Sequence, residues 1–214
     1  MGKTQTASLS STRHSPFHVE HSVEGLVGRY FPERQAEIRA FAEFLTSAGI
    51  ERGLIGPREG ERIWDRHIFN CLHITTLLPQ GASLFDIGSG AGLPGIVIAL
   101  ARPDLQVTLI EPLERRVEFL KEATAGTNIE VIRGRAQDVK KVADFVTARA
   151  VAPLEKLKKM SWHMVKTNGS LLAMKGEGAA GEMADMKNAK LHEITLEGIG
   201  LGRIVELRKG SAPL

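Results

Sequence analysis

The sequence predicts an α/β fold, with a mostly parallel sheet that is preceded by a helical extension and closed by an antiparallel hairpin. From residue 83 onward, short apolar runs alternate with helical segments, which is the rhythm of a doubly wound sheet. A glycine-rich turn at 88–92 joins an apolar strand to an apolar helix. Near the end of the chain, two segments of alternating polarity are separated by glycines. Together these patterns predict one sheet flanked by helices.

Residues 19–79 are expected to form the helical extension. Phe41, Phe44 and Leu45 recur at the spacing of a buried helix face, and Gly49 is placed to end that helix. Residues 53–60 contain a Gly-Pro pair and predict a loop. Further apolar residues between 63 and 77 predict another helix. The extension therefore precedes a larger domain, which we expect over residues 80–210.

The larger domain is expected to alternate strands with helices. Strands are predicted at 83–87, 106–110, 129–132, 144–148 and 170–174, and helices at 94–102, 113–123, 153–165 and 178–187. Residues 191–196 and 203–208 alternate in strand fashion around three glycines, which predicts the closing hairpin. Residues 1–18 are rich in Ser, Thr and Gln and are expected to be a disordered tail.

Composition narrows the class of protein. Of the 214 residues, 43% are hydrophobic and 25% are charged, as in globular proteins. No apolar run approaches the roughly 20 residues that cross a bilayer, and the N-terminus lacks the apolar core of a signal peptide. The single cysteine, Cys71, excludes an intramolecular disulfide. These features predict a cytoplasmic monomer without membrane contact, and the pI near 9.1 permits an anionic partner.

The glycine turn predicts a binding site for a nucleotide-like cofactor. Gly88, Gly90 and Gly92 let the backbone turn tightly and leave no side chain between it and a ligand. A nicotinamide fingerprint requires a third glycine where this chain has Leu93. Asp86 precedes the turn, and its carboxylate would repel a pyrophosphate but would suit an ammonium or sulfonium group. We therefore expect these five residues to contact a cationic cofactor.

Two further segments predict which cofactor binds. Glu111 ends the next strand, where it is placed to accept both ribose hydroxyls of an adenosine. Ala136 and Gln137 follow the third strand and are expected at the adenine edge. Together with the turn, these positions predict S-adenosylmethionine. The alternative is that the glycines only make a turn and that Glu111 is a solvated strand end.

Four motifs give the chain a family resemblance. They are Asp-Ile-Gly-Ser-Gly-Ala-Gly-Leu-Pro-Gly at 86–95, Trp-Asp-Arg-His-Ile-Phe-Asn-Cys at 64–71, Ala-Arg-Ala-Val-Ala-Pro-Leu at 148–154 and Met-Lys-Gly at 174–176. Over residues 20–210 the chain resembles the small-subunit ribosomal RNA methyltransferase G family, also called glucose-inhibited division protein B. The resemblance implies a Rossmann-like methyltransferase that acts on N7 of guanosine 527 (RNA numbering) in bacterial 16S rRNA. The partner would be that RNA, within the 30S subunit or an assembly intermediate.

Some positions depart from the family pattern. Asn70-Cys71 stand where the family more often has Asp-Ser, and Ala148 stands where it more often has Ser. Asn70 keeps hydrogen-bonding capacity but lacks the negative charge. Any role of that charge is therefore absent from this chain.

The residues are consistent with a ring-nitrogen acceptor. Guanine N7 presents a lone pair and carries no proton, so its methylation needs alignment rather than a general base. Residues 147–150 read Thr-Ala-Arg-Ala, where an exocyclic-amine methyltransferase typically has Asn/Asp-Pro-Pro-Tyr/Phe. A pyrimidine C5 methyltransferase needs a nucleophilic cysteine beside the cofactor, whereas Cys71 lies on a predicted N-terminal helix and reads as a small buried hydrophobe.

Basic residues at the strand ends are the candidates for catalysis and for RNA contact. Arg149 ends the fourth predicted strand, where the resemblance implies that it orients cofactor or substrate. The alternative for Arg149 is an ion pair with a neighbouring carboxylate, since an unpaired charge is costly to bury. Arg135 and Lys175 are the other catalytic candidates, and either can bind phosphate or the guanine O6 edge. The residues expected to contact RNA are Arg66, His67, Arg133, Arg135 and Lys175.

His67 has a second interpretation, as a structural residue, and the sequence predicts no metal site. Ile63, His67 and Asn70 share one helical face, so His67 can equally join the extension to the sheet. The seven histidines are scattered, and no ligand set for a metal is recognised.

Two other functions compete with the methyltransferase. One is a nicotinamide-dependent oxidoreductase, which Asp86 and Leu93 argue against. The other is a non-catalytic RNA-binding assembly factor on the same fold, which would bind RNA without turnover or cofactor.

Overall fold

The structure is a computed structural model, and it describes residues 22–183, 186 and 188–210. The predicted tail, residues 1–18, lies outside this range, as do residues 184, 185 and 187 of the helix predicted at 178–187. Among the described residues, no helix is both long and apolar enough to span a membrane.

A seven-stranded sheet with the order β3-β2-β1-β4-β5-β7-β6 organises the described residues. The first five strands along the chain pair in parallel, whereas β7 pairs antiparallel with both β5 and β6. The predicted parallel sheet with a closing hairpin is confirmed. The strands are β1 (Ser83–Ile87), β2 (Gln106–Glu111), β3 (Glu130–Arg133), β4 (Ala143–Arg149), β5 (Val165–Lys175), β6 (Ala189–Leu196) and β7 (Gly200–Arg208).

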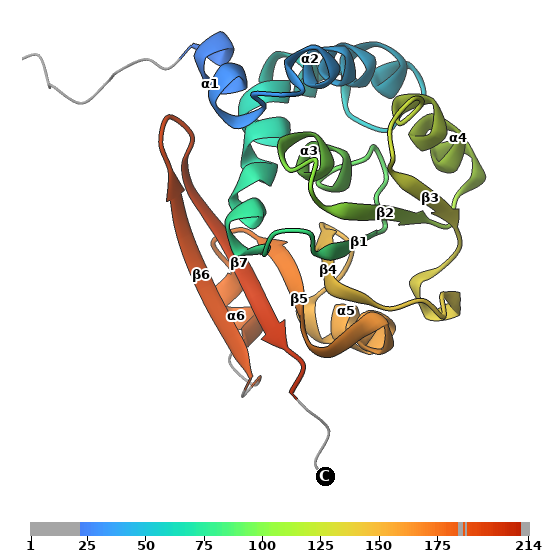
Figure 1. The fold of residues 1–214 in the computed structure, drawn as a ribbon, viewed down its shortest axis with the longest axis vertical. Helices are drawn as coiled ribbons and strands as arrows, with labels where there is room; N and C mark the ends of the chain where they lie inside the picture. Colours follow the sequence, from blue (N-terminus) through green and yellow to red (C-terminus); the bar gives the residue numbers. More distant parts are fainter. Residues whose placement is uncertain (1–21, 184–185, 187, 211–214) are drawn as a thin grey trace, which may run out of the picture.

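Helices cover both faces of this sheet (Figure 1). One face carries α1 (Val23–Tyr30), α2 (Gln35–Phe44), α3 (Gly95–Ala101) and α4 (Glu114–Ala123). The other carries α5 (Leu154–Ser161) and α6 (Ala179–Met183). Because neighbouring strand residues point to opposite faces, Leu84 packs in the apolar core on one face of the sheet and Phe85 in the core on the other. Burial on both faces explains why the parallel strands read as continuous apolar runs.

The N-terminal helices are more broken than the sequence predicts. The helix through Phe41 does not end at Gly49: it passes through a wide, π-type turn at Leu45–Gly49 and ends two residues later. Gly53, with φ +66°, terminates it, and its N–H donates to the Ile50 carbonyl. The predicted loop at 53–60 already contains the start of a 3₁₀ helix, Pro57–Arg62. A wide turn at Ile63–Phe69 and a 3₁₀ helix at Leu72–Leu77 replace the single helix expected there.

The junction between α5 and β5 also differs from the prediction. The helix predicted at 153–165 ends at Ser161 and is followed by a 3₁₀ turn at Trp162–Met164. Strand β5 begins at Val165 rather than at residue 170, and its register against β4 shifts there. The polar run before residue 170 reads as a loop, but Asn168 and Gly169 are tied to Lys209 by backbone hydrogen bonds of 2.9 Å.

The N-terminal segment, residues 22–79, is joined to the closing hairpin of β6 and β7 by hydrogen bonds and close packing. The Tyr30 hydroxyl donates to the Glu197 carbonyl (2.9 Å), and His73 Nε2 lies 3.0 Å from the Gly200 carbonyl oxygen. A Cβ at Gly202 would lie 2.3 Å from the His73 ring, so only glycine fits there. The carboxyl ends of β1, β2, β4 and β5 all open toward one edge of the sheet, beside this N-terminal segment.

Candidate active site

The glycine turn after β1 adopts the conformation that its sequence predicts. Gly88, Gly90 and Gly92 have φ values of +66°, +58° and +87°, a region that L side chains rarely adopt. A Cβ at Gly88 would lie 2.8 Å from Val151 Cγ2, and one at Gly92 would lie 2.4 Å from Ile96 Cδ1. The turn therefore needs glycine both for its backbone angles and for its close packing.

Asp86 lies beneath this turn. Its side chain is 0% exposed, and its Oδ2 accepts a hydrogen bond from the Gly95 N–H (3.0 Å) at the start of α3. A Cβ at Gly95 would lie 2.7 Å from that oxygen, so the close approach requires glycine. Within the described residues, Asp86 Oδ1 has no hydrogen-bond partner. Burial raises the pKa of Asp86 to about 7. An unpaired buried carboxyl oxygen beside the turn fits a ligand that carries a cation or an N–H donor.

Glu111, at the end of β2, faces the same turn and is only 1% exposed. Its Oε2 accepts from the Gly90 N–H and its Oε1 from the Leu113 N–H, both at 3.0 Å. The alternative that Glu111 is a solvated strand end is therefore wrong. Because a carboxylate offers about four acceptor positions, each oxygen keeps capacity for a ribose hydroxyl. Glu111 thus both shapes the turn and remains a candidate for ribose binding.

The predicted adenine edge follows β3. Residues Ala136–Asp138 form a short 3₁₀ turn in which Ala136 is buried and Gln137 is exposed. Leu93, at the far side of the turn, is also buried. These positions are compatible with an adenine pocket, and their contact with cofactor stays a prediction.

Arg149, at the end of β4, is not paired with a carboxylate anywhere in the described ranges. Its Nη1 faces the His67 carbonyl (3.4 Å) and the Cys71 sulfur (3.5 Å). Its Nη2 faces the Arg66 carbonyl (3.3 Å) and His67 Nδ1 (3.1 Å). The ion-pair alternative is therefore wrong, and the guanidinium is held by uncharged acceptors of the N-terminal segment. Its positive charge is not neutralised by an ion pair with any described residue.

His67 joins the N-terminal segment to the sheet. Its side chain is 12% exposed, and its Nε2 lies 2.7 Å from Glu59 Oε2. Glu59 also accepts from Arg66 Nη1 at 3.2 Å. Both ring nitrogens of His67 thus have partners inside the protein, which supports the joining role over RNA contact. Glu59 was missed by the sequence reasoning, because no motif links it to a histidine eight positions later.

Lys175, at the end of β5, is also engaged internally. Its side chain is 14% exposed, and its Nζ donates to Glu182 Oε2 (2.7 Å) and to the Ala152 carbonyl (3.2 Å). The same Glu182 oxygen accepts from the Leu154 N–H at 2.8 Å. Lys175 therefore fastens the segment after β4 rather than presenting its charge to solvent. Glu182 was likewise missed, since it follows Lys175 on a different element.

The remaining predicted RNA contacts lie at the surface. Arg133 pairs with Glu114 at 2.5 Å, and both side chains are exposed. Arg66 is exposed and pairs with Glu59. Arg135 is exposed, and its side chain makes no ion pair or hydrogen bond with any described residue. Of the predicted basic residues, Arg135 is therefore the most available to an anionic partner.

A cavity of about 310 Å³ lies beside Arg149, at the edge toward which the glycine turn faces. The strand ends that line it come from β4, β5 and β7, and the N-terminal segment supplies one wall. The lining residues are Asn70, His73, Arg149, Ala150, Met174, Lys175, Gly176, Gly202, Arg203 and Ile204. Ala150 has φ +55°, a strained value for a residue with a Cβ, directly after Arg149.

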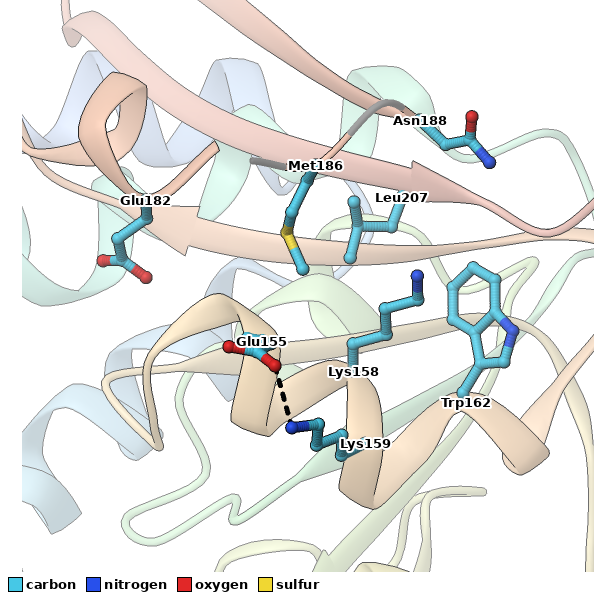
Figure 2. Close-up of a pocket in the computed structure, with 8 residues that line it drawn as sticks. All are labelled: Glu155, Lys158, Lys159, Trp162, Glu182, Met186, Asn188 and Leu207. Atoms are coloured by element: carbon cyan, nitrogen blue, oxygen red, sulfur yellow. Dashed lines mark ion pairs between the residues drawn. The ribbon is translucent and has the colours of Figure 1, made fainter. Parts of the chain in front are cut away.

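A larger hollow of about 700 Å³ lies away from this edge, between α5 and the hairpin (Figure 2). Glu155 pairs there with Lys159 at 2.8 Å, and Lys158 Nζ lies 5.1 Å from the centre of the Trp162 ring. Lys158 and Lys159 thus both have local partners within the protein.

Neither a nucleophilic cysteine nor a metal site is formed. Burial raises the pKa of the Cys71 thiol to about 11, and its sulfur faces the His67 carbonyl at 2.9 Å. The prediction of a small buried residue is therefore confirmed. In the part of the chain that is described, no three His, Cys, Asp or Glu side chains are grouped to hold a metal.

Comparison with known proteins decides the family. The model of a family described as "rRNA small subunit methyltransferase G" matches residues 34–199. A protein of Kineococcus radiotolerans named ribosomal RNA small subunit methyltransferase G is 50% identical over 186 residues, covering 84% of this chain and 72% of that protein. The chain belongs to the rRNA small subunit methyltransferase G family. The predicted family resemblance is therefore confirmed.

A second relative carries the same family name, and a solved structure shares the fold. A Thermobifida fusca protein of the same name is 45% identical over 197 residues, covering 89% of this chain and 81% of that protein. A solved methyltransferase from Pyrococcus furiosus shares the fold with a TM-score of 0.55 at 16% identity, covering 85% of this chain and all of that one. The Rossmann-like fold is thus confirmed.

Family membership settles the reaction class and the donor. The protein is a methyltransferase and S-adenosylmethionine is its methyl donor, as the glycine turn predicted. The nicotinamide-dependent alternative and the non-catalytic alternative are not supported. The residues at the turn fit this donor: the buried Asp86 carboxyl has an unpaired oxygen, and the three left-handed glycines leave the backbone accessible.

Proposed function

We propose that this protein transfers the methyl group of S-adenosylmethionine to N7 of guanosine 527 (RNA numbering) in 16S rRNA. The substrate is the RNA within the 30S subunit or an assembly intermediate, and the enzyme acts as a cytoplasmic monomer. Membership of the rRNA small subunit methyltransferase G family carries the proposal. The geometry adds a place for donor and acceptor: the glycine turn on one side, and the cavity beside Arg149 on the other.

The chain's own residues divide into two groups. Asp86 and Glu111, with the glycine turn, hold the donor, which when bound supplies an electrophilic methyl group. The cavity beside Arg149 receives the acceptor base, and Met174 and Ile204 give it an apolar wall. Arg135 and Arg66 are exposed and bind RNA phosphate, whereas Lys175 stabilises the segment at 150–154.

The reaction places few demands on proton transfer. N7 of guanine has a lone pair and no proton, so no side chain must act as a general base. This agrees with a cavity whose lining includes arginine and lysine but no carboxylate. Alignment of the two reactants is then the main contribution of the enzyme. The positive charge of Arg149 attracts the electron-rich O6 and N7 edge of guanine or the donor's carboxylate.

The direct test is transfer of labelled methyl groups to 30S particles, naked 16S rRNA and tRNA, followed by mapping of the modified base. We expect label at N7 of guanosine 527 and a preference for one of the two small-subunit substrates. Arg149→Met should abolish most of the transfer. Arg208→Met is the matched control, because Arg208 is exposed and its position in β7 pairs with Ser170 in the middle of β5, whereas Lys175 beside the cavity ends that strand. Label confined to tRNA or protein would contradict the proposal.

Donor binding is tested separately by thermal unfolding. S-adenosylhomocysteine at about 100 times its dissociation constant should stabilise the protein by about 2.7 kcal/mol. NADH at the same concentration should cause no shift. A shift with NADH alone would contradict the assignment of the glycine turn.

A further inference from the structure

We infer that Glu59 and His67 are positioning residues for Arg149, and that they hold its guanidinium at the acceptor cavity only while the His67 ring is neutral. The inference goes beyond the proposed function by naming how Arg149 is oriented. The methyl-transfer assay that tests the inference rests on that proposed function. The contacts that carry it are His67 Nδ1 to Arg149 Nη2 (3.1 Å) and His67 Nε2 to Glu59 Oε2 (2.7 Å).

The partners of His67 determine where its proton lies. A guanidinium has only donors, so the His67 nitrogen that faces Arg149 must be an acceptor without a proton. The single proton of a neutral ring is then on Nε2, where it is donated to the Glu59 carboxylate. The chain of hydrogen bonds therefore runs in one direction, from Arg149 through His67 to Glu59.

Protonation of His67 would break this chain. It would place an Nδ1–H against the Arg149 guanidinium, turning an attractive contact into a repulsive one. The charged groups that act on the ring are Glu59 from the 57–62 helix, Arg149 from β4 and Arg66 from its own segment. Burial is the largest influence and lowers the pKa of His67, and Arg149 lowers it further, whereas the bond to Glu59 raises it. The neutral ring is thus favoured near neutral pH.

Neutral acceptors suit this task better than a carboxylate would. A carboxylate beside Arg149 would orient the guanidinium but would also neutralise its charge at the cavity. The ring nitrogen and the carbonyls of Arg66 and His67 fix the same group without adding a negative charge next to it. The carboxylate of Glu59 is kept one residue further away, behind the ring. Arg149 therefore stays oriented and remains cationic toward its ligand.

Nitrogen-15 NMR of the His67 ring tests the inference without any activity assay. We expect an unprotonated Nδ1 and a protonated Nε2 near pH 7.5. In Arg149→Met the ring should titrate at a higher pH, since the cation is gone. A proton found on Nδ1 in the wild type would overturn the inference, even if methyl transfer is confirmed. Wild-type protein without methyl transfer to any RNA, but with this tautomer, would overturn only the proposed function.

Single-turnover methyl transfer as a function of pH provides the second test. His67→Asn retains an acceptor in place of Nδ1 but does not titrate, so its rate near pH 8 should stay within about threefold of the wild type. His67→Leu removes the acceptor and should lower the rate by about 3- to 10-fold near pH 8, and this difference from the wild type should shrink as His67 becomes protonated at lower pH. The ratio of wild-type to His67→Asn rates should be constant around neutral pH and should fall only below the ordinary histidine pKa of about 6.5, because the pKa of His67 is lowered. A ratio that is constant across the whole range would overturn the inference.

Glu59→Gln distinguishes positioning from a general loss of structure. Glutamine still accepts a hydrogen bond from the His67 Nε2–H but lacks the charge that raises the pKa of His67. The decrease of the methyl-transfer rate at low pH should therefore move to lower pH. Glu61→Gln is the matched control: it lies in the same 57–62 helix and is exposed, and its profile should match the wild type. An unchanged profile in Glu59→Gln would contradict the role of Glu59. Thermal unfolding of each variant shows whether it is folded under the assay conditions.

Discussion

The two halves of the candidate site are built from different parts of the chain. Around the glycine turn, Asp86 binds the Gly95 N–H and Glu111 binds the Gly90 N–H, nine and 21 positions away along the chain. Arg149, by contrast, is held by Arg66 and His67, more than 80 positions earlier. The donor half is thus assembled within two neighbouring strand–helix units, whereas the acceptor half needs the N-terminal segment. Loss of the Arg66 and His67 contacts should therefore affect the acceptor half more than the donor half.

The largest expected effect breaks the donor half alone. Gly92→Ala should lower the free energy of unfolding by about 2–5 kcal/mol. The alanine would have to adopt a left-handed backbone conformation, and its methyl group would overlap Ile96. Gly126→Ala is the matched control, since Gly126 has φ +79° but open space around its Cα. That control should lose only about 1–2 kcal/mol. Denaturant unfolding measures both, and equal losses would mean that packing at the turn adds nothing.

The second prediction breaks the acceptor half. Arg149→Met should slow methyl transfer by about 10- to 100-fold, equivalent to about 1.5–3 kcal/mol, because a charged contact to the ligand is lost. The affinity for S-adenosylhomocysteine measures the donor half in the same variant. If Arg149 acts on the acceptor, this affinity should change by less than the rate does. Arg149→Lys should recover part of the rate, since it keeps the charge but lacks the planar fork. Full activity in Arg149→Met would make Arg149 a structural residue.

The third prediction tests whether Glu111 shapes the turn as well as binding the donor. Glu111→Gln has one acceptor oxygen where Glu111 uses two, so either Gly90 or Leu113 loses its partner. Isothermal titration with S-adenosylhomocysteine should show a loss of about 1–3 kcal/mol. Glu114→Gln, an exposed neighbour on α4, should bind as the wild type does. Unchanged binding in Glu111→Gln would remove this carboxylate from the site.

The smallest effect concerns pH and Asp86. Burial raises the pKa of this carboxyl to about 7, so the affinity for S-adenosylhomocysteine, which keeps the ammonium group, should rise by up to about tenfold from about pH 6 to pH 8. Asp86→Asn should remove this dependence. The unliganded protein should respond in the opposite sense, because a raised carboxyl pKa adds stability at low pH that is lost as pH rises through 7. Relative to Asp86→Asn, wild-type stability should therefore fall over that range.

The same contrast explains how far sequence reasoning reaches. The turn, Asp86 and Glu111 follow from local spacing, since a strand, a glycine turn and a helix determine one another's positions. The partner of Arg149 does not, because the fold alone brings His67 and Glu59 to the end of β4. The ion-pair alternative for Arg149 was wrong for that reason, and so was the exposed role of Lys175, whose partner Glu182 lies on α6. The roles of Arg135, Ala136 and Gln137 stay predictions, as does the division into an extension and a domain at residue 80.

The contacts between the N-terminal segment and the closing hairpin have a consequence for the order of biosynthesis. Tyr30 and His73 leave the ribosome long before their partners at Glu197 and Gly200 are synthesised. Strand β7 also lies between β5 and β6, so the sheet is continuous only after the last strand has been added. Until then, the hydrogen-bonding edge of β5 lacks a neighbour and the early helices lack part of their support. During translation, maturation of the enzyme therefore waits for residues 200–208, and a nascent chain that stops before them has an exposed strand edge open to chaperones.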